Sequence, residues 1–252
     1  MKTKITLLLL LPTIGFSQIN ILNQIKNEVK EEIKKVIPID LPTSSSSVGN
    51  IDISNGLKEA LNNGVAKQVS KLTATDGFYK NQMVKILLPE EFRKVDKALR
   101  KMGLSSLANK GILMLNRAAE DAVKESTSIF VEAIKNMSFT DAKNILMGNE
   151  NSATTYLQTS TTTPLYAKFN PVIKNSFSKV GADKVWASII KKYNSIPMVE
   201  KVNPDLTDYT TNKALEGVFK MIAVEEKSIR TDLKSRTSPL LLKVFAMQDK
   251  IE

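Results

Sequence analysis

The sequence contains no cysteine and no histidine. Without cysteine the chain can form neither a disulfide nor a thiolate site, and it cannot carry a lipid on an N-terminal cysteine. Without histidine it lacks the commonest general base and the commonest metal ligand of proteins. Any catalysis would have to use carboxylates, Ser, Thr, Lys or Tyr. The sequence therefore favours a non-catalytic protein over an enzyme, and it predicts no metal site and no cofactor.

Signals for nucleic-acid and phosphate binding are also scarce. Aromatic residues make up only 6% of the chain, and no stacking platform of interleaved aromatic and Arg residues occurs. The formal net charge of +10 favours anionic partners in general. Without a stacking platform, however, nucleic acid is disfavoured as the partner. Gly-rich phosphate loops and Asp-rich loops of calcium-binding spacing are absent from the sequence as well.

Long apolar runs are absent except at the N-terminus, which reads MKTKITLLLLLPTIGFSQ. Two lysines, a short apolar core and small residues at 15–17 are typical of a cleaved secretory signal peptide. The apolar run over residues 5–16 is short for a membrane span and contains Pro12, although a retained anchor is the alternative. We therefore assign residues 1–17 to a signal peptide. We expect a soluble extracytoplasmic protein, periplasmic or secreted, that is not a lipoprotein.

An amphipathic segment and a Ser-rich segment follow the signal. Residues 18–37 predict a helix with one apolar face. Residues 38–52, which start at a proline and include a run of four serines, have the composition of a flexible linker. Four lysines in the helix are matched by three glutamates, so we expect it to dock on its own domain or to self-associate rather than bind lipid. Its apolar face comprises Leu22, Ile25, Val29, Ile33 and Val36.

Helical signals dominate residues 53–248. A strand-like run, MVKILLP at residues 83–89, stands alone and cannot form a sheet by itself. We predict an all-α fold, a single compact domain of about eight to ten helices preceded by the tethered amphipathic helix. The first expected helices cover residues 54–73, 89–102 and 105–137, and a short helix runs from the Ser138-x-x-Asp141 capping pattern to Gly148. The next starts at Thr163-Pro164 and should be kinked or split at Pro171. Further helices are expected around Trp186, from Asp205 or Thr207, and from Ser238-Pro239 to about Met247.

The stretch MLNRAAEDAV, residues 114–123, places polar side chains on a helix of small and apolar residues. At about 100° per residue, Asn116 and Glu120 lie at the border of the apolar stripe, whereas Arg117 faces solvent and can reach Glu120 three residues on. A carboxylate at this border needs a partner, because burying it alone costs several kcal/mol. The pair belongs to a structural polar network between helices, to the lining of a pocket, or to plain surface.

Several sequence blocks occur in a fixed order: GLKEAL, DGFYKN, VKILLP, LNRAAEDA, FTDAKNILMG followed by SATTYL, and DLTDYTTNKALEGVF. Over roughly residues 56–245 the chain resembles a family of exported bacterial proteins catalogued as domain of unknown function family 4197. The resemblance implies an export signal and a mostly helical domain, but no established activity, substrate or cofactor. The N-terminal helix and linker lie outside it. Family-like positions, which are our candidates for a ligand-binding site or structural polar network, are Asn116, Arg117, Glu120, Asp141, Thr154 and Tyr156.

Three functions remain open. The sequence favours a non-catalytic helical binding or scaffold protein of the bacterial cell envelope, with an envelope protein, an anionic surface or a small ligand as partner. The second is a carboxylate-dependent hydrolase of an envelope glycan or peptide. It would use Glu120 with Asp141 across a cleft of about 5–10 Å, because Asp121 diverges from Glu120 by about 100°. The third is an anionic-lipid or membrane-surface binder that uses the basic residues between Arg93 and Lys101.

Overall fold

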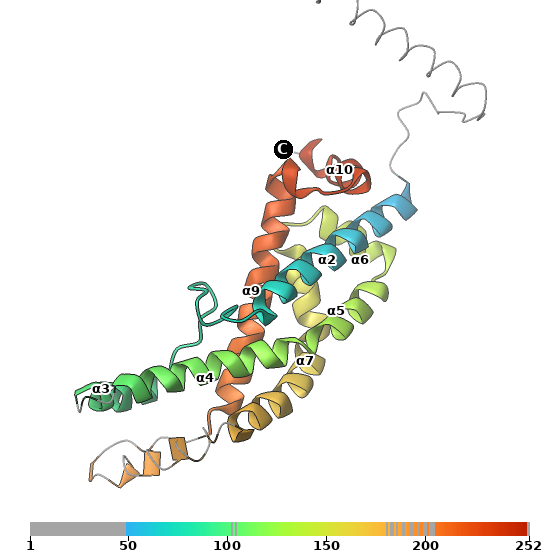
Figure 1. Cartoon of the computed structure of the whole chain (residues 1–252). Helices are drawn as coiled ribbons and strands as arrows, with labels where there is room; N and C mark the ends of the chain where they lie inside the picture. Colours follow the sequence, from blue (N-terminus) through green and yellow to red (C-terminus); the bar gives the residue numbers. More distant parts are fainter. Residues whose placement is uncertain are drawn as a thin grey trace, which may run out of the picture. The chain divides into compact units, whose positions relative to one another are not determined.

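The computed structural model describes residues 49–250, except residues 102, 104 and 180 and a scatter of positions between 182 and 204. The predicted signal peptide, the amphipathic helix and most of the linker lie outside the described residues. Eight α-helices occur in the part that is described, and no residue there belongs to a strand (Figure 1). The predicted all-α fold is therefore confirmed.

The first helix, α2, begins at Asn50, so its first three residues fall in the segment that the sequence assigned to the linker. No helix in the described ranges is both long and apolar enough to cross a membrane. In chain order the helices are α2 (Asn50–Thr73), α3 (Arg93–Lys101), α4 (Ser105–Val123), α5 (Ser126–Lys135), α6 (Phe139–Leu146), α7 (Ser152–Lys179), α9 (Thr207–Thr231) and α10 (Pro239–Phe245).

The central helix of the domain is α9. It packs against α2, α4 and α7, which it crosses in turn in Figure 1. Between Ala214 and Ile222 only Glu216 and Lys220 are exposed, because the sequence there is almost entirely apolar or small. Gly217 is required in this helix, since a Cβ at that position would lie 2.7 Å from the ring of Phe78. A glycine thus lets the loop after α2 pack closely on α9.

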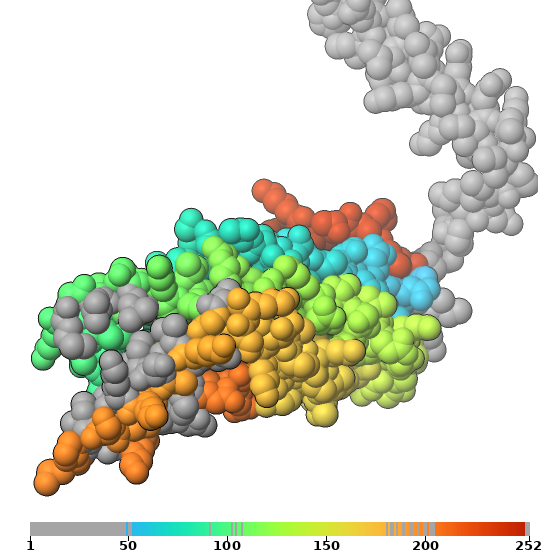
Figure 2. All heavy atoms as spheres, turned by 60° about the horizontal axis from the view of Figure 1, so that its bottom comes forward, coloured from blue at the N-terminus to red at the C-terminus, as the bar shows by residue number. Residues whose placement is uncertain are grey.

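Two further helices cover the core formed around α9. α7 packs along α4, α5 and α6, and Figure 2 shows it, in yellow to gold, on the surface beside the green α4 and α5. α2 packs against α5, α6, α9 and α10. The apolar faces of these helices are buried against one another, and this burial is the main favourable term for a helical domain of this kind.

The helix predicted over residues 105–137 is two helices, α4 and α5, and the prediction was wrong at this point. The backbone N–H groups of Lys124 and Glu125 donate three residues back rather than four, which tightens the chain into a turn. Ser126 is buried after the turn, and its hydroxyl donates to the carbonyl of Val123 at 2.7 Å. The apolar stripe continues across the turn, so periodicity alone does not reveal the break.

The prediction for α7 was wrong in the opposite direction, because this helix is longer than expected. The sequence predicted a helix start at Thr163-Pro164, but α7 starts at Ser152 and continues through both Pro164 and Pro171. Hydroxyl groups of the Thr-rich stretch donate to carbonyls four residues back on the same helix. Burial along the whole helix outweighs the backbone hydrogen bonds that the prolines cannot make. Its buried residues include Ala153, Leu157, Thr161, Leu165, Phe169, Ile173 and Phe177.

The strand-like run at residues 83–89 is extended over its second half but joins no sheet. Val84, Ile86 and Leu88 are buried, whereas Lys85 and Leu87 are exposed. This alternation is typical of a strand with one face on the core. No second strand pairs with it among the residues described, so its backbone must find other partners.

Candidate functional site

Asn116 of α4 is completely buried, and its side chain makes the hydrogen bonds with Ile86 that a neighbouring strand would otherwise make. Its side-chain oxygen accepts the N–H of Ile86, and its amide nitrogen donates to the Ile86 carbonyl, both at 2.8 Å. The same amide nitrogen also donates to the carbonyl of Ile112 at 2.7 Å. Both amide donors are thereby used. The side chain fastens the extended segment to α4 and satisfies a buried backbone at the same time.

Glu120, one turn further along α4, holds the loop that follows α2. Its Oε1 accepts the N–H of Phe78 at 3.1 Å and that of Tyr79 at 3.4 Å. Its Oε2 accepts from the guanidinium of Arg117 at 2.6 Å, which is the ion pair expected from the sequence. The carboxylate is buried and fully paired. It therefore anchors the loop to α4.

Arg117 carries this network to the surface. It donates to Asp76 at 2.5 Å as well as to Glu120, and 38% of its side chain is exposed. A hydrogen bond from Lys80, supported by the one from Arg117, holds the pKa of Asp76 below its ordinary value. Asp76 has a left-handed backbone, with φ of 68°. The next residue must be Gly77, because a Cβ there would lie 2.4 Å from a backbone oxygen of α2.

A second buried carboxylate, which the sequence analysis did not identify, lies on α9. Glu226 accepts the N–H groups of Ala153 and Thr154 at 2.9 and 2.8 Å, and also the hydroxyl of Thr154 at 2.8 Å. These groups are at the N-terminus of α7, where the helix dipole favours a negative charge. The predicted site residue Thr154 therefore belongs to this network, and no hydrogen bond in the described part of the chain links it to Glu120.

Arg230 completes the second network. It donates to Glu226 at 2.9 and 3.0 Å and to the carbonyls of Ile145 and Leu146 at 2.8 and 3.2 Å, at the C-terminus of α6. The dipole of α6 favours a positive charge at that end. The side chains of Arg230 and Glu226 are only 3% and 5% exposed. Their i, i+4 spacing in EEKSIR was visible in the sequence, but exposed ion pairs have helical spacings too.

The remaining two candidate residues have separate local roles. Asp141 closes a capping box with Ser138: each residue's backbone N–H donates to the other's side chain, at 3.0 and 3.1 Å, as the sequence predicted. The hydrogen bond from the Ser138 hydroxyl lowers the pKa of Asp141. Tyr156 is half-buried and donates to the carbonyl of Ala133 at 3.4 Å, and burial raises the pKa of its hydroxyl. No hydrogen bond or ion pair links Asp141 to Glu120 in the described residues.

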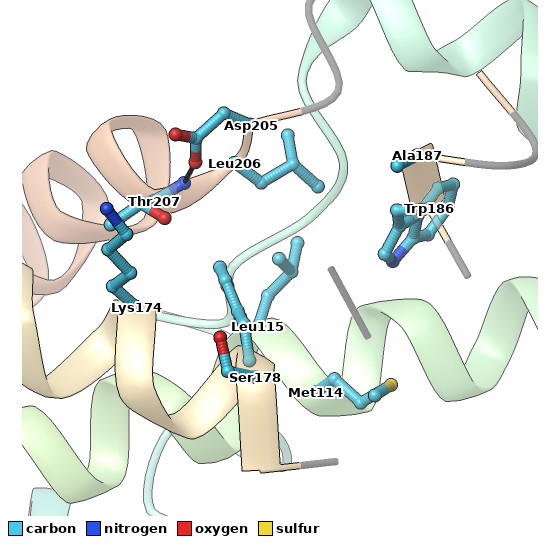
Figure 3. Close-up of a pocket in the computed structure, with 10 residues that line it drawn as sticks. Met114, Leu115, Lys174, Ser178, Trp186, Ala187, Asp205, Leu206 and Thr207 are labelled. Atoms are coloured by element: carbon cyan, nitrogen blue, oxygen red, sulfur yellow. Dashed lines mark hydrogen bonds between the residues drawn. The ribbon is translucent and has the colours of Figure 1, made fainter. Parts of the chain in front are cut away.

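A cavity of 210 Å³ lies on another face of α4, at Met114 and Leu115 (Figure 3). Most of its wall is apolar and comes from α4, α7 and the residues before α9. Lys174, Asp205 and Thr207 lie together at one end, and Trp186 and Ala187 lie at the other. Neither Asn116 nor Glu120 lines it. The apolar lining residues are Met114, Leu115, Phe177, Trp186, Ala187 and Leu206.

Trp186, the single tryptophan of the chain, forms one end of this cavity and is held there firmly. Its ring packs edge-to-face on Phe92 at 5.6 Å between centroids. The ring also lies directly on α4 at Gly111, where a Cβ would be only 2.2 Å away. Figure 3 shows the indole nitrogen on the side of the ring that faces Met114 and Leu115. No residue that the structure describes accepts a hydrogen bond from it.

The polar end of the cavity contains one engaged carboxylate and one cation. Asp205 accepts the N–H of Thr207 at 2.8 Å. Its pKa is lowered, chiefly by hydrogen bonds from Thr207 and to a smaller extent by the charge of Lys174. Lys174 is exposed and has no ion pair with any residue in the described ranges. The cavity thus offers an apolar wall with an ammonium group and an indole N–H as unused donors.

The comparisons with known proteins identify a family and assign no role to the site. The sequence profile of a family described as "Protein of unknown function (DUF4197)" matches residues 47–246. Neither the curated proteins nor the solved structures contain a match to the chain. The matched region covers most of the chain and includes all eight described helices together with both glutamate networks. The chain therefore belongs to the DUF4197 family of proteins of unknown function.

Proposed function

We propose that this protein is a non-catalytic binding protein of the bacterial cell envelope, exported by its N-terminal signal. Its ligand would be a small molecule with an apolar body and an anionic group, bound in the cavity beside Trp186. The observation that carries the proposal is the composition of this cavity. An apolar wall with a few polar groups gathered at one end is the usual composition of a small-molecule site.

The size of the cavity limits the ligand. Its volume of 210 Å³ is below the range of roughly 300–1,000 Å³ that is common for drug-sized ligands. The occupant is therefore a short amphiphile, or the end of a longer chain that extends into solvent. Trp186 and Leu115 supply flat and branched apolar surface for such a chain.

The charge of the ligand follows from which polar groups are available. Asp205 is already engaged by Thr207, whereas the ammonium of Lys174 and the indole N–H of Trp186 are donors without partners in the described part of the chain. A ligand that offers acceptors, above all a carboxylate, matches both donors. The excess of basic residues in the whole chain also attracts anions.

The test uses Trp186 as a built-in reporter, because any fluorescence change from tryptophan must come from this cavity wall. We expect hexanoate and octanoate to change its emission in a saturable way, and hexanol and octanol to bind about tenfold more weakly, because a charge-assisted hydrogen bond is lost. Lys174→Met should remove the preference for the carboxylate. Lys168→Met, at an exposed position of α7 outside the cavity, is the matched control.

Two outcomes would overturn this proposal. One is the absence of any saturable response to either series, by fluorescence and by calorimetry. The other is an unchanged preference for the carboxylate in Lys174→Met, which would show that the anion binds elsewhere.

The two other functions considered from the sequence have weaker support. A hydrolase would need the Glu120 carboxylate to be free, but two backbone N–H groups and Arg117 already bind it. On the basic face of α3 both arginines are already paired, Arg93 with Glu90 at 3.3 Å and Arg100 with Asp96 at 2.9 Å, which leaves the lysines of this helix for an anionic lipid surface.

A further inference from the structure

The extended segment at residues 83–89 has one satisfied edge and one open edge. Ile86 uses both of its backbone groups on Asn116. In an extended chain the backbone groups of the two neighbouring residues, Lys85 and Leu87, point to the opposite edge. On that edge the Leu87 carbonyl accepts the hydroxyl of Tyr209 at 2.8 Å.

Two backbone groups on this open edge have no partner among the residues described. The Lys85 N–H is used within the preceding turn, where it donates to the carbonyl of Asn81 at 2.8 Å. The Leu87 N–H and the Lys85 carbonyl make no hydrogen bond to any residue that the structure describes. They form one donor and one acceptor on the same edge, which is the pattern that an added strand would pair with.

A groove of 480 Å³ runs beside this edge. One wall is the segment itself, and the other is the N-terminal half of α9 with Tyr209 and Lys220. Figure 1 shows the segment, in teal, beside α9. Leu87 and Met83 line the groove and are 56% and 45% exposed. Exposed apolar side chains next to an unpaired extended edge are a combination that soluble proteins usually avoid.

The charges along the groove indicate which sign of charge a partner should carry. Its two acidic residues are both neutralised, Glu90 by Arg93 at 3.3 Å and Glu216 by Lys213 at 2.6 Å. Lys85 and Lys220 also line the groove, and neither forms an ion pair in the described part of the chain. Lys85 lies over the ring of Tyr79 at 4.3 Å. The groove therefore has two uncompensated positive charges, one on each wall.

We propose that this groove binds an extended, acidic segment of a partner polypeptide, which adds a strand to residues 83–89. The partner's backbone would accept from the Leu87 N–H and donate to the Lys85 carbonyl. Apolar side chains on one face of the added strand would cover Leu87 and Met83, and carboxylates on its other face would meet Lys220 on the opposite wall, while the ammonium of Lys85 adds to the positive charge of the groove. Backbone pairing gives affinity in such complexes, and the alternating side chains give specificity. The groove shares no lining residue with the cavity beside Trp186.

The test uses three labelled octapeptides and fluorescence anisotropy. The first alternates Glu and Val, the second alternates Lys and Val, and the third is the Glu–Val peptide with every second backbone nitrogen methylated. We expect the Glu–Val peptide to bind with an affinity that falls steeply with salt. The Lys–Val peptide should not bind. The methylated peptide should bind at least tenfold more weakly, because it cannot donate to the open edge.

Two variants locate the binding on the groove. Leu87→Pro removes the unpaired N–H in a backbone that is already extended, and should weaken the Glu–Val peptide about tenfold. Lys220→Glu should abolish binding, whereas Lys168→Glu makes the same charge change on α7, away from the groove, and should have little effect. Circular dichroism and Trp186 emission check that each variant is folded. If Leu87→Pro does not fold, Lys220→Glu and the methylated peptide still decide the question.

The proposal is overturned if the Glu–Val peptide does not bind at millimolar concentration. Equal binding of the methylated peptide would also overturn it, because the open edge would then play no part. Equal losses in Lys220→Glu and Lys168→Glu would show attraction to net charge alone. None of these results depends on whether the cavity beside Trp186 binds an anion.

Discussion

Glu120 and Glu226 are two buried carboxylates that have the same kinds of hydrogen-bond partners but lie in different surroundings. Each accepts two successive backbone N–H groups from a distant segment, and each pairs with an arginine about one turn away on its own helix. Arg230, the partner of Glu226, is almost completely buried and reaches only protein groups. Arg117, the partner of Glu120, is 38% exposed and continues to Asp76 at the surface.

We call the Glu226 network closed, because its arginine is buried, and the Glu120 network open, because its arginine reaches solvent; each network joins two segments of the chain. The Glu226 network joins two helix ends, and both of its charges lie where the helix dipoles stabilise them. The Glu120 network instead fixes an irregular loop to α4, and water can solvate its arginine. Loss of the carboxylate should therefore lower the free energy of unfolding more at Glu226 than at Glu120, because only Arg230 would be left buried without a counter-charge.

The largest effect is expected for Glu226→Gln. The substitution keeps the shape of the side chain but leaves Arg230 without its counter-charge, so we expect a loss of about 3–5 kcal/mol in the free energy of unfolding. Urea denaturation followed by circular dichroism measures it. Arg230→Met should cost a similar amount, because it leaves Glu226 charged and buried. A loss below about 1 kcal/mol in both variants would contradict the closed joint.

A smaller effect is expected for Glu120→Gln. The amide oxygen can take the place of Oε1 and accept both backbone N–H groups. Arg117 loses its hydrogen bond to Oε2 but keeps Asp76 and solvent, so the loss should be about 1–3 kcal/mol. Asp121→Asn on the same helix is the matched control. Its pair with Lys124 is exposed, so its loss should stay below about 1 kcal/mol. A cost at Glu120 equal to that at Glu226 would remove the distinction between the two networks.

The sequence predicted those parts of the fold whose signals are local. The capping box at Ser138 and Asp141 and the start of α10 after Ser238 depend on residues within one helical turn, and both occur as predicted. The break between α4 and α5 and the continuity of α7 through two prolines depend on packing with other helices. Those two features could not be predicted from periodicity because the apolar pattern is the same in both alternatives.

The candidate site was likewise predictable only where its signals are local. The helical positions of Asn116 and Glu120 correctly indicated side chains at the border of the core. Their partners, Ile86 and Phe78, lie 30 or more residues away, so the sequence could not identify them. Glu226 was missed for a related reason: its spacing from Arg230 is that of any surface pair, and only the ends of α6 and α7 make it a buried joint.

The smallest predicted effect is a change in stability with pH, and it concerns only the open network around Glu120. Because the pKa of Asp76 is lower in the folded protein than its ordinary value of about 3.9, its contribution to stability is complete above that value and is lost as the pH falls through the folded pKa. Asp76→Asn should therefore be less stable than the wild type at pH 7. The difference in the free energy of unfolding should shrink as the pH falls below about 4.

Urea denaturation of both proteins between pH 7 and pH 2.5 measures this difference. Asp121→Asn is again the control, since Asp121 is an exposed carboxylate on the helix that carries Arg117. A difference for Asp76→Asn that stays constant with pH would mean that the substitution acts through the left-handed backbone of the loop and not through the charge. The backbone of the loop, and not the charge of Asp76, would then stabilise the exposed end of the Glu120 network. In that case the two networks would differ less in their dependence on charge than the exposure of their arginines indicates.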